Sequence, residues 1–232
     1  MRPKVSVIIP AYNEAKTIKE LKLEVIRSLI SKSSTNSAEI IIVDDGSTDD
    51  TYRFANGNGT IVLRNEKNSG YGAAVKKGLD HATGDILVTI DGDYQNNPLE
   101  IPSLIDALIK TGADFINGSK FLGRFKPKVP FIKKIGEKIV GFLIKLIYRK
   151  RITYSQSGFK AFKRTLYEKV KPIKEERFGF NSELLVKSLK HGFNIKEVPV
   201  TIKPRPHGKS RIQFFKDGLR ILYVFMRTIL RG

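Results

Sequence analysis

The first half of the chain alternates short apolar runs with longer amphipathic stretches. The apolar runs are rich in Ile and Val, as buried strands are, and they cover residues 5–10, 39–43, 60–63, 85–90 and 113–117. Helical periodicity marks the stretches at 14–30, 71–81 and 98–110. Strands that alternate with helices form parallel sheets with helices on both faces. The pattern therefore predicts an α/β fold with a mixed, mainly parallel sheet flanked by helices.

Polar residues directly follow three of the predicted strands. They are Ala11-Tyr12-Asn13-Glu14, Asp44-Asp45 and Asp91-Gly92-Asp93. Because ligands of open α/β sheets bind at the carboxyl ends of the strands, we expect these three clusters to form one site.

The pattern changes near residues 118–130, where glycine, proline and lysine accumulate. Two later stretches have apolar residues at helical spacing, with basic residues elsewhere on the helical wheel. The apolar positions are Ile132, Ile135, Ile139, Phe142, Leu146 and Ile147 in the first stretch, and Phe215, Leu219, Leu222, Met226 and Ile229 in the second. Such helices either pack on the core or lie in the interface of an anionic membrane. Both interpretations stay open at this point.

The formal net charge is +19, and most of it comes from these two regions. Residues 120–151 hold 11 Lys and Arg but one acid, Glu137, and residues 203–232 hold 8 but one acid, Asp217. A basic patch indicates a polyanionic partner, either nucleic acid or anionic lipid. Nucleic-acid binders interleave bases with exposed aromatics or present a recognition helix. The bases here flank aliphatic helical faces, which favours lipid.

Several other classes of site are excluded or disfavoured by composition. The chain has no cysteine, so it has neither disulfides nor thiolate chemistry, and its three histidines lack a zinc-binding spacing. No stretch reaches the roughly 20 apolar residues that span a bilayer. The glycine-rich turn at 68–72 lacks the Walker lysine and the full dinucleotide fingerprint, which disfavours ATPases and dehydrogenases.

The triplet Asp91-Gly92-Asp93 carries the clearest chemistry. Two carboxylates separated by one glycine at a strand end can hold Mg²⁺ or Mn²⁺ against a diphosphate, and Gln95 can add an oxygen ligand. An ordinary acidic turn is the alternative. Similarly, the acidic turn at residues 44–49 is expected to cap the next helix, and its two adjacent acids, Asp44 and Asp45, can also bind the ribose hydroxyls and the base of a nucleotide.

In combination, these motifs resemble the family 2 glycosyltransferases of the GT-A fold, in particular the dolichyl- or polyprenyl-phosphate mannose and glucose synthases. The resemblance extends from Val7 to about Arg211 and rests on the order and spacing of many short motifs. These are residues 7–14, 42–49, 70–74, 91–95, 118–120, 157–160, 183–185, 197–199 and 205–211.

The resemblance implies a role for each matching residue. The nucleoside pocket is expected to contain Pro10, Tyr12, Glu14, Val43 and Asp45. Metal and diphosphate are expected at Asp91, Gly92, Asp93 and Gln95. The phosphates of donor or acceptor are expected at Lys120, Arg205, Lys209 and Arg211. Glu183 is expected either to bind sugar hydroxyls or to orient a loop. The reaction itself is assigned to Asp91, Asp93, Lys120, Arg205 and Arg211.

Three residues depart from the family pattern. Lys120 replaces the usual arginine, Arg211 replaces a lysine, and Tyr154 stands where relatives carry an aspartate before Ser157. If that aspartate were an obligatory base, the enzyme would be crippled. A lipid phosphate, with a second pKa near 6, is largely ionised at pH 7 and needs little help from a base. Tyr154 thus favours a phosphate acceptor over a sugar hydroxyl.

We therefore expect a hexosyltransferase that moves a sugar from GDP-mannose or UDP-glucose to dolichyl or polyprenyl phosphate, with inversion and with Mg²⁺ or Mn²⁺. Residues 1–211 form the catalytic domain, divided into a nucleotide-sugar-binding half at 1–118 and an acceptor half at 119–211 that includes an interface helix at 131–149. Residues 212–232 form a membrane-associated amphipathic helix. The expected location is the cytoplasmic face of a membrane, either alone or with a transmembrane partner.

Two alternatives for the function stay open beside this one. The acceptor can be a hydroxyl of a glycan or glycolipid, or the chain can be a non-catalytic partner that binds a nucleotide sugar. Nucleic acid is not an expected partner.

Overall fold

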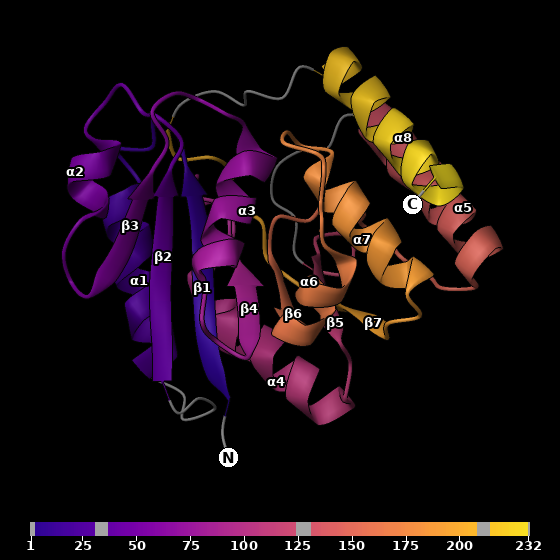
Figure 1. Ribbon diagram of the computed structural model, residues 1–232, viewed down its shortest axis with the longest axis horizontal. Helices are drawn as coiled ribbons and strands as arrows, with labels where there is room; N and C mark the ends of the chain where they lie inside the picture. Colours follow the sequence, from indigo (N-terminus) through magenta and orange to yellow (C-terminus); the bar gives the residue numbers. More distant parts are fainter. Residues whose placement is uncertain (1–2, 31–36, 124–130, 208–213, 232) are drawn as a thin grey trace.

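The computed structural model describes residues 3–30, 37–123, 131–207 and 214–231. Within these ranges one seven-stranded sheet forms the centre of the molecule, in the order β3-β2-β1-β4-β6-β5-β7 (Figure 1). The strands are β1 (Lys4–Ala11), β2 (Ser37–Asp44), β3 (Thr60–Arg64), β4 (Ile86–Thr89), β5 (Phe115–Ser119), β6 (Lys160–Lys163) and β7 (Ile195–Pro199). β6 is antiparallel to β4 and β5, and the other pairs are parallel. This confirms the predicted mixed, mainly parallel sheet.

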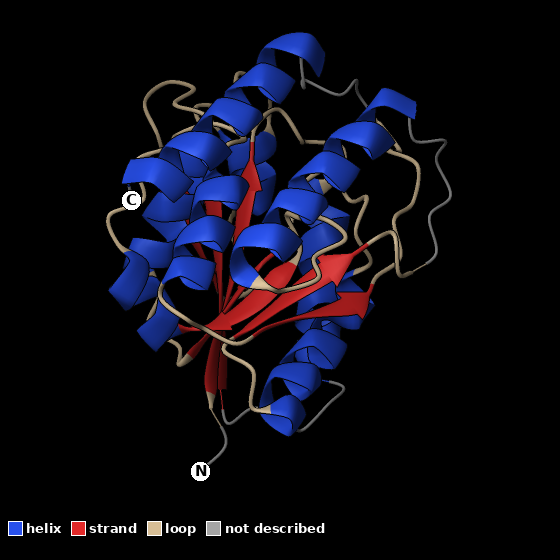
Figure 2. Ribbon diagram, turned by 90° about the vertical axis from the view of Figure 1, so that its right-hand side faces the viewer, coloured by secondary structure: helices blue, strands red, loops and turns tan. Residues whose placement is uncertain are grey.

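Helices cover both faces of the sheet, as Figure 2 shows. They are α1 (Ile18–Ile30), α2 (Thr51–Ala55), α3 (Tyr71–His81), α4 (Ile101–Thr111), α5 (Phe131–Tyr148), α6 (Arg164–Val170), α7 (Phe180–Lys190) and α8 (Phe214–Arg231), with a short 3₁₀ turn at Pro98–Glu100 before α4. Side chains of β1 alternate between two hydrophobic clusters. Ile8 packs with α3, α6 and α7, whereas Val7 and Ile9 pack with α1 and α4. Because these strands are buried on both faces of the sheet, their sequences are continuous apolar runs without alternating polar positions.

The first predicted helix starts later than its periodicity indicates. Residues 14–30 were expected to be helical, but α1 begins at Ile18. Asn13 has a left-handed φ of 53°, and its backbone N–H and side-chain oxygen bond to Ser47 and Thr48. The chain therefore turns across the sheet edge before the helix begins, which brings residues 12–14 to the ends of the strands.

α5 and α8 lie on the same side of the molecule as α7 (Figure 1). Each buries a narrow inner side, formed by Val140 and Ile144 in α5 and by Val224 and Phe225 in α8. Many of their apolar side chains are instead exposed, namely Ile135, Ile139, Phe142, Leu146 and Ile147 in α5 and Leu219, Leu222, Tyr223, Met226 and Leu230 in α8. Most of the apolar stripe found in the sequence is thus not used by the core.

The apolar faces predicted for α5 and α8 are not exposed along their whole length. Ile229 is the exception on α8, because it is partly buried against the core. The side chains of Ile132 and Phe215 lie outside the described part of the chain. No helix in the described ranges is long and apolar enough to cross a membrane.

Candidate active site

A cavity of about 1130 Å³ opens at the carboxyl ends of β1, β2 and β4. It brings together the three polar clusters that follow these strands. Of the predicted site residues, those that line it are Pro10, Tyr12, Glu14, Asp45, Asp91, Gly92, Asp93, Gln95, Lys120 and Arg205. Arg211 and Lys209 lie outside the described residues.

Two predicted site residues point elsewhere. Val43 is fully buried in the cluster with α3, because alternate side chains of β2 face that helix. Glu183 on α7 is also buried, and its carboxylate accepts hydrogen bonds from the backbone N–H groups of Lys174 and Glu175. Of its two expected roles, the geometry matches loop orientation and not sugar binding.

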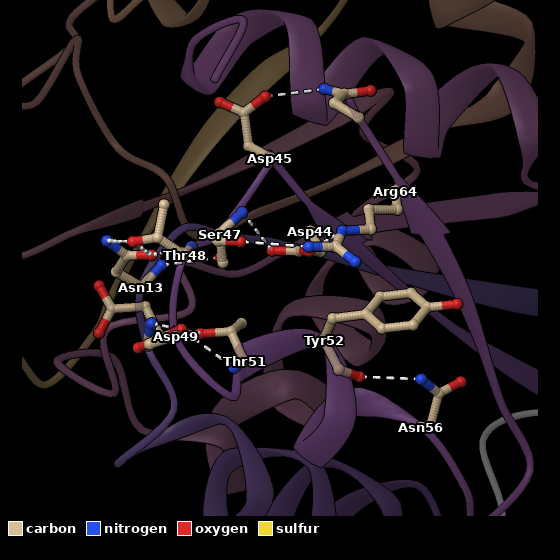
Figure 3. Close-up of polar contacts among 12 residues, drawn as sticks. Asn13, Asp44, Asp45, Ser47, Thr48, Asp49, Thr51, Tyr52, Asn56 and Arg64 are labelled. Atoms are coloured by element: carbon tan, nitrogen blue, oxygen red, sulfur yellow. Dashed lines mark hydrogen bonds and ion pairs between the residues drawn. The ribbon is translucent and has the colours of Figure 1, made fainter. Parts of the chain in front are cut away.

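The acidic turn after β2 has a structural role, which Figure 3 shows in detail. Asp44 is buried, pairs with Arg64 at 3.1 Å and accepts a hydrogen bond from the Ser47 N–H. Asp49 accepts a hydrogen bond from the backbone N–H of Thr51, the first residue of α2. Asp49 thus bonds to the start of α2, as the capping interpretation of the turn expects, but the N-cap residue itself, Asp50, makes no side-chain capping bond.

Asp45 reaches the cavity and also holds the glycine-rich turn. Its carboxylate accepts hydrogen bonds from Asn65 Nδ2 (2.7 Å), Ser69 N (3.0 Å) and Gly70 N (2.8 Å). Gly70 has a φ of 105°, and a side chain there would overlap the carbonyl of Glu176. The turn is therefore a packing device that positions the start of α3 beside the cavity.

The carboxylates of Asp91 and Asp93 form the electrostatic centre of the site. Oδ1 of Asp91 is buried, and no described residue gives it a hydrogen-bond partner. Burial, with the neighbouring Asp93 charge, raises the pKa of Asp91 to about 7, while Lys160 opposes the shift. Burial also raises the pKa of Asp93, and the charge of Arg205 opposes it. An unpaired carboxylate oxygen beside a second carboxylate fits a hard divalent cation such as Mg²⁺ or Mn²⁺.

Asp91 and Asp93 are not accompanied by further acidic metal ligands among the described residues. Among the described residues, no group of three or more His, Cys, Asp or Glu is placed to hold an ion. Gln95 uses its Nε2 to donate to the carbonyl of Lys203 at 3.1 Å, which ties the segment before Arg205 to the site. Only its amide oxygen is thus left to serve as a ligand. A cation here would therefore depend on oxygens from a bound diphosphate or from water.

Two basic side chains also line the cavity, those of Arg205 and Lys120. Arg205 is paired with Glu14 and lies 3.9 Å from Oδ2 of Asp93. Lys120 lies over the ring of Tyr154, with its Nζ 4.2 Å from the ring centroid, which is a cation–π distance. Burial raises the pKa of Tyr154, so its phenol stays protonated at neutral pH.

Other residues of the cavity were not predicted from the sequence to be site residues. They are Tyr71, Gln156, Arg177, Phe178, Asn181 and, from α8, Asp217, Leu219, Arg220 and Tyr223. The helical pattern of α8 was recognised, but nothing in that pattern indicates that the helix borders the cavity. Gln156 and Phe178 lie in irregular segments, where periodicity gives no signal.

The fold and the site together define a glycosyltransferase. The sequence model of Glycosyl transferase family 2 matches residues 6–171, so the chain belongs to family 2 of the glycosyltransferases. This agrees with the resemblance found in the sequence.

Two relatives and one solved structure are informative. The chain is 32% identical to UDP-N-acetylglucosamine–dolichyl-phosphate N-acetylglucosaminyltransferase of Methanococcus voltae, over 94% of this chain and 93% of the relative. It is 34% identical to dolichol-phosphate mannosyltransferase of Pyrococcus furiosus, over 98% of this chain but 63% of the relative. Glucosyl-3-phosphoglycerate synthase from Mycobacterium tuberculosis, solved with Mn²⁺, UDP and glucosyl-3-phosphoglycerate, superposes with a TM-score of 0.75 at 22% identity, covering 97% of this chain and 80% of that one. This structure supports the GT-A fold.

Proposed function

We propose that the chain transfers a sugar from a nucleotide-sugar donor to a dolichyl or polyprenyl phosphate at a membrane surface. The observation that carries the proposal is that side chains of α8 border the cavity and the outer surface of the molecule at once. Leu219 and Tyr223 line the cavity and are also exposed, at 71% and 61%. A lipid acceptor needs this arrangement, because its phosphate must enter the cavity while its chain stays in an apolar phase. Both archaeal relatives named above carry dolichyl or dolichol phosphate in their names.

The donor is proposed to lie along the carboxyl edge of the sheet. Its nucleoside would contact Pro10, Tyr12 and Asp45, and its diphosphate would lie between Asp91-Asp93 and the cations Lys120 and Arg205. A divalent cation bound by Asp91 and Asp93 would offset the charge that develops on the departing nucleoside diphosphate. GDP-mannose and UDP-glucose are the first donors to test, and the name of the Methanococcus relative adds UDP-N-acetylglucosamine.

The reaction would be a single displacement with inversion. An oxygen of the acceptor phosphate forms a bond to the anomeric carbon while the bond from that carbon to the diphosphate breaks. The leaving group takes the electron pair, and no proton has to move. Tyr154 fits this chemistry, because its protonated phenol is no base and a lipid phosphate requires none.

The membrane surface would be met by α5 and α8. Their exposed apolar side chains lie among basic residues, which suits the interface of an anionic bilayer. Since nucleotide sugars are cytoplasmic, we assign the chain to the cytoplasmic face, with either the membrane alone or a membrane-spanning protein as its partner.

The test compares two matched acceptors, a polyprenyl phosphate and the corresponding polyprenol, in detergent with Mn²⁺. Each is incubated with the three labelled donors in parallel. Label in the lipid phosphate from one donor, and none in the polyprenol, is expected. Transfer to the polyprenol would instead assign a hydroxyl acceptor. Nucleotide-sugar binding without transfer to either lipid would contradict the proposal.

A further inference from the structure

Three uncharged polar side chains line the cavity near Asp91, and the mechanism above leaves them unused. Tyr71 is the first residue of α3, Gln156 lies in the loop before β6, and Asn181 is in the first turn of α7. We propose that Tyr71, Gln156 and Asn181 form the subsite for the sugar of the donor, and that this subsite selects a neutral sugar through its hydroxyl groups. The inference rests on the proposed function, since it assumes a nucleotide-sugar donor.

Asn181 is held in one orientation by a buried cation. Lys160 is fully buried on β6, and its Nζ donates to Oδ1 of Asn181 at 2.6 Å. Burial lowers the pKa of Lys160 to about 7, and the charge of Asp91 opposes the shift. In its protonated form Lys160 has no acceptor to offer, so the amide cannot reverse without placing its NH₂ against the ammonium. The Nδ2 donor of Asn181 is then directed away from Lys160, toward the Tyr71 hydroxyl and the cavity.

The side-chain amide of Gln156 is also held in one orientation, but with its oxygen left for a ligand. Its Nε2 donates to the hydroxyls of Ser155 and Ser182, so both of its N–H groups are used within the protein. Its Oε1 then remains as the acceptor for a ligand. Asn181 thus offers a donor to the cavity, while Gln156 offers an acceptor.

Tyr71 provides a buried hydroxyl whose contacts with its described neighbours are poorly directed. Its ring is held by stacking on Phe178, with centroids 5.7 Å apart, and by an edge contact with Phe180. The Tyr71 hydroxyl lies beside Asp91 and Asn181. Yet this buried oxygen makes no well-directed hydrogen bond to any described residue. Buried hydroxyls in native proteins nearly always have a well-directed partner, so a ligand hydroxyl can compete with Asp91 and Asn181 for this one.

These groups together indicate the class of ligand. A sugar hydroxyl both donates and accepts, so the hydroxyls of one sugar can bond to the Asn181 amide, the Gln156 carbonyl and the Tyr71 hydroxyl, which line the same cavity. Asp91 stands next to Tyr71, which places the subsite beside the proposed diphosphate position, where the sugar of a donor must lie. A uronate would bring a carboxylate toward Asp91 without a matching cation in the trio. The subsite is therefore specific for a neutral hexose or N-acetylhexosamine.

The test is Tyr71→Phe, because it removes one oxygen and no well-directed hydrogen bond among the described residues. Calorimetry with Mn²⁺ compares the affinity of each nucleoside diphosphate with that of its nucleotide sugar, for the UDP-glucose, UDP-N-acetylglucosamine and GDP-mannose pairs. We expect the preferred nucleotide sugar to bind roughly three- to ten-fold more weakly, which corresponds to one hydrogen bond. The diphosphate alone should bind as before, and the melting temperature should not fall. Tyr52→Phe, on α2 and outside the residues that line the cavity, is the matched control.

A second variant, Gln156→Met, removes the acceptor without adding charge and should weaken the same nucleotide sugar selectively. The proposal is overturned if Tyr71→Phe and Gln156→Met leave the ratio of the two affinities unchanged. It is also overturned if sugar and diphosphate affinities fall together, or if UDP-glucuronate binds as well as UDP-glucose. None of these readouts requires an acceptor, so failure of lipid transfer with intact selectivity would refute the proposed function and leave the subsite standing.

Discussion

The guanidinium of Arg205 lies 3.9 Å from the carboxylate of Asp93, although the two residues are far apart in the sequence. The same guanidinium nitrogen, Nη2, is also paired with Glu14. Without a ligand, Arg205 therefore supplies positive charge at the place where the metal is proposed to bind. A donor diphosphate would give Arg205 a new anionic partner, so donor binding and release of Asp93 toward a cation are expected to be linked.

The first prediction concerns this competition. Arg205→Gln should raise the affinity for Mn²⁺ alone by several-fold, because Asp93 loses a neighbouring cation. The same variant should lower sugar transfer by about ten- to a hundred-fold, because a charged contact to the diphosphate is lost. Mn²⁺ titration followed by paramagnetic resonance measures the first effect. Arg53→Gln, an exposed surface variant, is the control. Weaker Mn²⁺ binding to Arg205→Gln would contradict the competition.

The second prediction is a pH dependence of metal binding. Because the pKa of Asp91 is raised to about 7, the side chain is protonated below that pH, and a cation must displace the proton. Mn²⁺ affinity should therefore fall as pH drops below about 7, by up to about ten-fold per pH unit. Calorimetry from pH 5.5 to 8.5 would measure this. A constant affinity down to pH 5.5 would show that Asp91 is not a ligand.

The same shift predicts how the metal changes stability. A carboxyl group with a pKa raised by folding stabilises the protein fully below its unfolded pKa, and that contribution is lost as pH rises through about 7. A bound cation offsets this loss because it favours the ionised form. The increase in melting temperature caused by Mn²⁺ should therefore be larger at pH 8 than at pH 6. An equal increase at both values would argue against the site.

The third prediction follows from the contact between Gly158 and Asp91. A Cβ at residue 158 would overlap the carboxylate of Asp91, so Gly158→Ala must displace that side chain. We expect metal-dependent transfer to fall by at least about a hundred-fold, given the sensitivity of catalysis to small displacements. Gly136→Ala is the matched control, because a Cβ there meets no other group and stabilises a helix by roughly 0.5–1 kcal/mol. Full activity of Gly158→Ala would refute the assignment of Asp91.

The fourth prediction concerns Glu183 as a positioning residue. Its carboxylate joins the loop at Lys174 and Glu175 to Arg227 of α8. Glu183→Gln should lower the free energy of unfolding by roughly 2–3 kcal/mol, because an amide cannot accept every bond that the carboxylate accepts.

Two results would check the role of Glu183. The half-exposed Glu168 should tolerate Gln with little change in the urea midpoint. If Glu183 only orients the loop, the ratio of diphosphate to nucleotide-sugar affinity should stay constant in Glu183→Gln. A selective loss of sugar affinity would instead support direct contact with the donor sugar.

The fifth prediction tests the surface of α5 and α8. Phe142→Glu with Leu230→Glu should abolish flotation with vesicles of anionic lipid, because both side chains are largely exposed and each substitution adds a negative charge. Leu99→Glu with Ile109→Glu adds the same two charges at half-exposed positions in and just before α4 and is the control. Equal flotation of both proteins would assign membrane binding to another surface.

The alternation of apolar strands and amphipathic helices was sufficient to predict the first five strands and the residues that follow them. The strands up to β5 are apolar runs, and the DxD triplet follows β4 directly, so the meeting of residues 12–14, 45 and 91–93 could be inferred from strand order. β6 was missed because its sequence begins and ends with lysine. Lys160 is nevertheless buried, since Asn181 accepts its hydrogen bond and Asp91 lies near it. Both partners are distant in sequence, and no local signal reports them.

Part of the site could not be predicted from the sequence, because it depends on contacts between residues that are distant in the chain. Val43 was assigned to the nucleoside pocket by resemblance, yet the side-chain alternation of β2 turns it into the core. Gln156 and Asn181 acquire a directed donor and acceptor only through neighbours brought together by folding. The exposure of the apolar faces on α5 and α8 likewise depends on where the two helices dock, which periodicity does not specify.

The most direct test of the account is transfer of labelled sugar into a polyprenyl phosphate by the wild-type protein and by Asp93→Ala, each with Mn²⁺ or with EDTA. The account predicts lipid-linked label for the wild type with Mn²⁺, and none for the variant or with EDTA. Undiminished transfer by Asp93→Ala, or transfer that persists in EDTA, would contradict it.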